Sequence, residues 1–86
     1  MIWVTDAKAL PAYRLWVRFS DGAEGEIELE RFIFDDTRSI VRALRDPATF
    51  ARVQIAHDTV TWDNGFDLAP EFLYDRKRVS ASLSPH

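Results

Sequence analysis

Apolar and polar residues alternate strictly along the segment that ends at Phe19. The apolar positions are Tyr13, Leu15, Val17 and Phe19, separated by Arg14, Trp16 and Arg18. A period of two is typical of a strand with one buried face. After Asp21-Gly22 the alternation resumes with Gly25, Ile27 and Leu29 set between Glu24, Glu26, Glu28 and Glu30. The pattern predicts a second strand with one apolar and one acidic face.

These faces decide how the two strands pair, because residues opposite each other in a hairpin point to the same side. A two-residue Asp21-Gly22 turn would set Phe19 opposite Glu24 and mix the faces. A three-residue loop of residues 20–22, with Gly22 left-handed, keeps them separate. The pairs expected from this loop are Leu15 with Ile27, Arg18 with Glu24, and Arg14 with Glu28.

Other segments complete the expected elements. Ile2 and Val4 alternate with Trp3 and Thr5, so residues 2–9 should add a strand to a meander that ends near residue 30. A helical period follows, with Asp36 or Thr37 as the expected cap. The first helix should contain Ile40, Val41 and Leu44. Asp46-Pro47 should end it and start a second helix over Ala48 to Arg52, with Phe50 inward.

The C-terminal part predicts a second hairpin and a last helix. Val53 and Ile55 should pair with Trp62 and Val60 around a His57-Asp58 turn. We expect Trp62 in the core, a reversal at Asn64-Gly65 where positive φ is accessible, and a short helix opened by Pro70. Asp67 is expected to accept backbone N–H groups at the start of that helix.

The expected fold class is therefore α+β: an antiparallel meander plus a second β-hairpin, with short helices packed on one sheet face. With 86 residues and 47% hydrophobic content, the chain should form one domain. We assign it to residues 1–79 and expect residues 80–86 to form a flexible tail.

Charge and composition narrow the classes of partner. A net charge of −3 gives no general attraction to phosphate backbones or anionic lipid, so neither nucleic acid nor a membrane is the expected partner. The chain has no cysteine, which excludes disulfides and thiolate metal sites. No basic leader precedes an apolar run, and we expect a cytoplasmic protein.

No residue set indicates catalysis, a cofactor or a metal. His57 and His86 fall in a turn and in the tail, and neither has a second ligand at a suitable spacing. The spacing of Asp58, Asp63, Asp67 and Glu71 does not fit a calcium loop. The glutamate stripe of residues 24–30 is what a solvent-facing strand produces, and Arg76-Lys77-Arg78 suits a helix C-terminus. We expect a protein that is not an enzyme.

Trp3 and Trp16 are the best candidates for a contact surface, because alternation turns both away from the core positions. Together with Arg14 and Arg18 they form the expected interaction surface. This face could instead be covered by a helix or form the seam of a homodimer. Gly22, Asn64 and Gly65 are expected to be structural turn residues.

Three blocks of the chain resemble the DUF2442 family of small bacterial proteins. They are Phe19-Ser20-Asp21-Gly22, the segment from Leu44 to Phe50, and the segment from Trp62 to Tyr74. The resemblance implies an α+β domain without an assigned enzymatic activity or accepted catalytic residues. Some relatives carry an added helix-turn-helix segment, for which we expect this chain to be too short. Relatives are also associated with a small protein encoded next to them.

The expected function is thus that of a non-enzymatic protein-interaction module without a cofactor, the antitoxin-like partner of a small co-encoded protein. The expected binding partner is that protein or a second copy of the chain in a homodimer. Two alternatives stay open: a nucleic-acid-binding component of a transcriptional regulator, and a small ligand-binding protein. The first would need a basic face, and the second a concave pocket with convergent polar groups.

Overall fold

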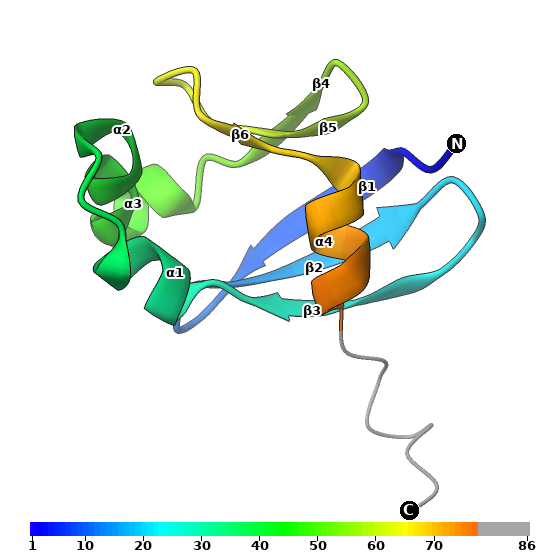
Figure 1. Cartoon of the computed structure of the whole chain (residues 1–86), viewed down its shortest axis with the longest axis horizontal. Coiled ribbons are helices and arrows are strands. Elements are labelled where there is room, and N and C mark those ends of the chain that lie inside the picture. Colours follow the sequence, from blue (N-terminus) through cyan, green and yellow to red (C-terminus); the bar gives the residue numbers. More distant parts are fainter. Residues whose placement is uncertain (78–86) are drawn as a thin grey trace, which may run out of the picture.

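The computed structural model describes residues 1–77, which form two three-stranded antiparallel sheets with short helices (Figure 1). The predicted α+β class is confirmed. The predicted tail of residues 80–86 lies outside the described residues. The first sheet contains β1 (Val4–Leu10), β2 (Arg14–Phe19) and β3 (Glu24–Glu28), and the second contains β4 (Gln54–Ala56), β5 (Thr59–Thr61) and β6 (Asp67–Leu68). The helices are α1 (Glu30–Asp35), α2 (Ser39–Arg42), the 3₁₀ turn η1 (Ala43–Arg45), α3 (Pro47–Phe50) and α4 (Pro70–Arg76).

The β2–β3 hairpin has the register that the two faces predicted. Gly22 has a φ of 90°, and the Phe19 N–H donates to the carbonyl of Ala23 over 2.8 Å, which closes a three-residue loop. All three expected pairs form: Leu15 with Ile27, Arg18 with Glu24, and Arg14 with Glu28.

The second hairpin has Ile55 opposite Val60, as expected, but its ladder ends at the Gln54–Thr61 pair, so the expected pairing of Val53 with Trp62 is not part of it. His57 and Asp58 both have positive φ, 54° and 68°, as a two-residue turn of this kind requires. The hairpin is extended by β6, which the sequence pattern did not predict: Thr61 pairs with Asp67, and Val60 with Leu68. A strand of two residues is too short to produce a readable alternation.

β1 begins later than predicted and contains an irregularity. Val4 lies opposite Phe19, but the register shifts before Asp6, which lies opposite Arg18. The shift lets Val4 and Ala7 face the same side although they are three residues apart, as a β-bulge allows. The strand ends at Leu10.

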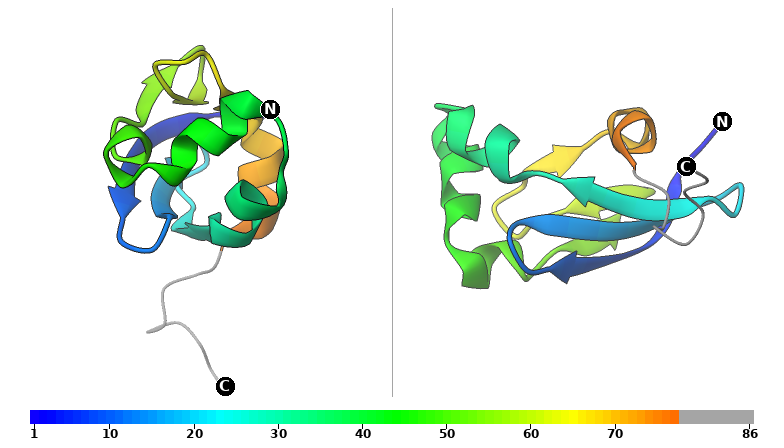
Figure 2. Two further views of the ribbon diagram at one scale, coloured as in Figure 1. Left: turned by 90° about the vertical axis from the view of Figure 1, so that its left-hand side faces the viewer. Right: turned by 90° about the horizontal axis from the view of Figure 1, so that it is seen from below.

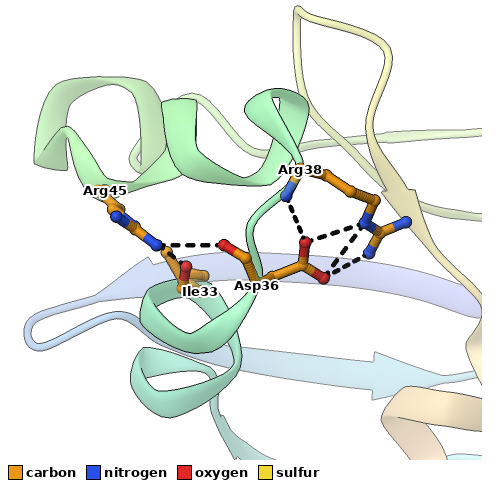
Figure 3. A network of polar contacts seen from close by, with 4 residues as sticks. All are labelled: Ile33, Asp36, Arg38 and Arg45. Atoms are coloured by element: carbon orange, nitrogen blue, oxygen red, sulfur yellow. Dashed lines mark hydrogen bonds and ion pairs between the residues drawn. The ribbon is translucent and has the colours of Figure 1, made fainter.

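The helical region differs from prediction at its start. α1 was not predicted, and the expected cap at Asp36 or Thr37 is wrong, because α2 begins at Ser39 with Arg38 as its N-cap residue and no side-chain capping bond. Asp36 instead accepts hydrogen bonds from the backbone and side chain of Arg38 (Figure 3). The Arg45 guanidinium donates to the carbonyls of Ile33, Phe34 and Asp36, which satisfies the C-terminal end of α1.

The predicted starts of α3 and α4 are confirmed, but the capping residue predicted for α4 is wrong. Asp46 caps α3 by accepting the Ala48 N–H over 3.1 Å, and Pro47 occupies the first turn as predicted. Pro70 likewise opens α4. The capping role predicted for Asp67 is wrong: the N-cap residue is Ala69, which makes no side-chain capping bond, because Asp67 belongs to β6.

The core lies between the inner face of the first sheet and the second sheet. α4 closes the front, and α1 to α3 gather at one end (Figures 1 and 2). Trp62 is among the largest buried side chains, as predicted. The other fully buried large side chains are Phe19, Leu15, Ile27, Leu29, Ile33, Leu44, Leu73, Val4, Val17, Val41 and Val60.

Candidate interaction surface

The outer face of the first sheet, opposite the core, carries a mixture of charges around one indole. We call it the outer face; seen from below in Figure 2, neither the second sheet nor a helix of residues 1–77 crosses in front of it. Its side chains come from alternate positions of the three paired strands, namely Asp6, Lys8, Leu10, Arg14, Trp16, Arg18, Glu24, Glu26 and Glu28. Packing against a helix of residues 1–77 therefore does not determine the orientation of these side chains.

Trp16 lies at the centre of the outer face. Its Nε1–H donates to Oε1 of Glu24 over 3.0 Å, and the Arg18 guanidinium lies 5.2 Å from the centre of its ring. Lys8 is its neighbour on β1. Trp16 is partly buried, and a partly exposed aromatic ring beside charged groups can contact a partner.

Arg14 and Arg18 both engage β3. Arg14 lies directly opposite Glu28, but its Nη1 pairs diagonally with Oε1 of Glu26 at 2.8 Å. Arg18 lies 3.7 Å from Oε2 of Glu24. The side chains in both pairs are about one third to one half exposed, so water screens them and each contributes little to stability.

Trp3 lies directly before β1, beside the β2–β3 loop. It precedes the buried Val4, and its backbone is tied to Ser20, whose N–H donates to the Trp3 carbonyl over 2.8 Å. The indole is 43% exposed. The structure thus groups Trp16, Arg14 and Arg18 closely and leaves Trp3 beside the hairpin loop.

The three predicted turn residues belong to two loops of the same form. Gly65 has a φ of 92°, and the Trp62 N–H donates to the Phe66 carbonyl over 2.9 Å, as Phe19 does to Ala23 around Gly22. Asn64 also reaches outside its loop, because its Nδ2 donates to the carbonyl of Ile40 over 2.9 Å. Sequence reasoning missed this bond, which joins the loop to α2.

Reactive or metal-binding groups do not gather in the part of the chain that the structure describes. Within residues 1–77 no three His, Asp or Glu side chains form a group that could hold a metal ion. His57 lies in the β4–β5 turn. In residues 1–77 there is also no helix with the length and apolar character needed to cross a membrane.

One hollow of about 370 Å³ lies between the β1–β2 turn and α3, and its lining is mostly apolar. Tyr13 contributes to this wall, but its hydroxyl already donates to the Arg45 carbonyl. The hollow therefore lacks the convergent polar groups that orient a small ligand.

Two carboxyl groups outside the outer face have shifted pKa values. Hydrogen bonds from the Arg38 side chain and backbone lower the pKa of Asp36 to about 2. The Tyr74 hydroxyl lies 2.7 Å from Oδ2 of Asp21, lowers the pKa of that carboxyl, and has its own pKa raised. Because this pair joins residues 53 positions apart, no local sequence pattern could have indicated it.

Comparison with known proteins identifies the family. The family model described as "Protein of unknown function (DUF2442)" matches residues 4–79, so the chain belongs to the DUF2442 family, as its sequence blocks suggested. No protein with a curated description matches it in sequence.

A solved structure shares the fold. It is that of a "Putative DNA Binding Protein" from Nitrosomonas europaea ATCC 19718, with 28% sequence identity and a TM-score of 0.75. The match covers 90% of this chain and 49% of that one, so this chain spans about half the length of that protein.

Proposed function

We propose that this member of the DUF2442 family is a non-enzymatic protein-interaction domain that contacts its partner through the outer face. The observation that carries the proposal is Trp16, a partly accessible indole that contacts both Glu24 and Arg18 on a sheet face that no described helix covers. An aromatic ring with fixed orientation and flanking charges is typical of the residues that dominate protein contacts. The expected partner is the small co-encoded protein of the family resemblance, in an antitoxin-like pair.

The experiment is oxidative footprinting of the three tryptophans. A tagged domain is captured with its partner from cells that express both at native levels, and indole oxidation is compared with that of the isolated domain. We expect Trp3 and Trp16 to be labelled in isolation and protected in the complex. Trp62, 1% exposed, serves as the internal control because it should stay unlabelled in both. Unchanged labelling of Trp16 in the complex would rule the outer face out as the interface.

Nucleic-acid binding is the second candidate, and the structural neighbour supports it. This chain corresponds to about half of a protein described as a "Putative DNA Binding Protein", and the identity of 28% extends over 90% of the chain. The charges of the outer face argue against phosphate contact there, because Arg14 and Arg18 are paired with glutamates. Arg45 is likewise engaged, by carbonyls.

The two candidates differ in how binding responds to salt. A domain that contacts phosphates through several basic side chains should shift duplex DNA in a gel, and its affinity should fall steeply with ionic strength. The protein-interaction proposal expects no such shift. A salt-dependent shift that survives mutation of Trp16 would favour the nucleic-acid function.

A further inference from the structure

The outer edge of β3 has backbone groups available for another strand. β3 is the last strand of the order β1-β2-β3. At its two ends, the Phe19 N–H donates to Ala23 and the Leu29 N–H donates to Tyr13. Since bonding alternates along an antiparallel pair, the N–H and C=O groups of the intervening even-numbered residues, Glu24, Glu26 and Glu28, point away from β2. Within residues 1–77 no backbone bond from another element reaches them.

The opposite edge of the sheet is partly occupied. β1 contacts β4 and β5, and the Val4 N–H donates to the Asp58 carbonyl over 2.9 Å. β3 contacts α4, but the Tyr74 ring of that helix packs against Phe19 on the core side of the sheet. The edge of β3 is therefore the one at which a strand could be added.

The side chains along this edge determine which charge an added strand should carry. Glu24, Glu26 and Glu28 all project from the outer face beside the edge. On the side of β2, these glutamates lie next to Arg14 and Arg18, which project from alternate positions of that strand. The side chains of an added strand would alternate in the same way on the other side of β3. A strand added about 4.8 Å away would place every second side chain next to a glutamate.

From this arrangement we propose that the edge of β3 binds an extended, basic segment of a partner protein by strand addition. The inference rests on the proposed protein-interaction function and specifies the partner's chemistry. A second copy of β3 does not fit, because continuing the sheet would set glutamates beside glutamates, and like charges in that position are destabilising. Nucleic-acid phosphates are repelled for the same reason.

The test uses a synthetic peptide of eight residues that alternates arginine and threonine, added to the isotope-labelled full chain. Backbone amide resonances are followed by nuclear magnetic resonance. We expect shifts at Glu24, Glu26 and Glu28, and slower hydrogen exchange of their amides. The same peptide with N-methyl groups on the amides that face β3 should bind roughly tenfold more weakly, because it cannot form the ladder.

Charge variants complete the design. Glu26→Lys should weaken binding by roughly tenfold, and Glu26→Gln by less. Glu71→Lys is the matched control: it makes the same charge change on α4, and binding should stay within twofold, which is about 0.4 kcal/mol.

Three results would overturn the edge site. These are equal binding of the N-methylated peptide, which would mean attraction without pairing, dimerisation through β3, and absence of any binding. If footprinting shows Trp16 protected in the native complex while the β3 amides do not respond to the peptide or the partner, the proposed function stands and the edge site is wrong.

Discussion

The indole Nε1–H of Trp62 donates to the backbone carbonyl of Phe50 over 3.0 Å, in the interior of the domain. The bond ties the second sheet to the end of α3, a helix of only four residues. The rings of Phe50 and Phe66 both pack near the indole, each with its centre 5.9 Å away. Trp62 therefore holds the helical end of the molecule to the sheets through both packing and a buried hydrogen bond.

Trp62→Ala should lower the free energy of unfolding by about 3–5 kcal/mol, because it leaves a large cavity and an unpaired carbonyl. In a domain this small such a loss removes most of the stability. Trp62→Phe is the control that keeps part of the ring and loses the N–H, and it should cost less. Urea denaturation followed by circular dichroism measures both. A Trp62→Ala variant as stable as the parent would contradict the assignment of this residue to the core.

Gly22 and Gly65 are expected to be limited by backbone conformation and not by space. Both have φ near 90°, and a Cβ built at either position meets no atom within 4 Å. Gly22→Val and Gly65→Val should each destabilise by about 1–3 kcal/mol, since a β-branched residue is strained there. Asparagine tolerates positive φ, so Gly22→Asn and Gly65→Asn should cost less. Equal melting temperatures for all four variants and the parent would refute this explanation.

Asp36 should make stability depend on pH in the acid range. Its carboxyl has a pKa of about 2 in the folded chain against an ordinary 3.8, so the unfolded chain takes up the proton first. The stabilisation is present above pH 3.8 and should be lost as the pH falls toward 2. The measurement is the difference in unfolding free energy between the parent and Asp36→Asn across this range. A difference that stays constant would show that the Arg38 contact does not exist in solution.

Tyr74 should titrate above its ordinary value of 10.0, because ionisation would break its hydrogen bond to Asp21 and set two negative charges together. This contact stabilises the fold fully below pH 10.0, and the contribution is lost as the pH rises through the raised pKa. Ring resonances of labelled tyrosine report the titration. Asp21→Asn should bring the Tyr74 midpoint down, and an unchanged midpoint would count against the contact.

The β2–β3 register could be predicted because both strands have one buried face. Placing Phe19 opposite Glu24 would have turned an apolar side chain to water, so parity alone selected the three-residue loop. The two-residue His57-Asp58 turn set Ile55 opposite Val60, although Ile55 is 39% exposed. The register of a hairpin depends on residues that are close together in the chain, so their alternation can be read from a single sequence.

The errors occurred where a polar group had more than one available partner. The end of α1 is satisfied by Arg45, ten residues beyond the last residue of the helix, and Asp36 is engaged by Arg38 instead of capping α2. Asp67 pairs with Thr61 in a sheet and is unavailable to α4. The outward direction of Trp16 followed from alternation, but its bond to Glu24 and the diagonal pairing of Arg14 with Glu26 depend on side-chain geometry that the register leaves open.

The most direct test of the interaction surface is a comparison of folding and partner binding in one variant, Trp3→Ser with Trp16→Ser. We predict an unfolding free energy within about 1 kcal/mol of the parent, because Trp3 is exposed before β1 and Trp16 projects from the outer face, outside the buried core. In the same preparation, capture of the partner, or self-association measured by sedimentation, should be lost. Loss of the fold would place these indoles in the core, and a folded variant that still binds its partner as the parent does would contradict the central claim that the outer face is the interface.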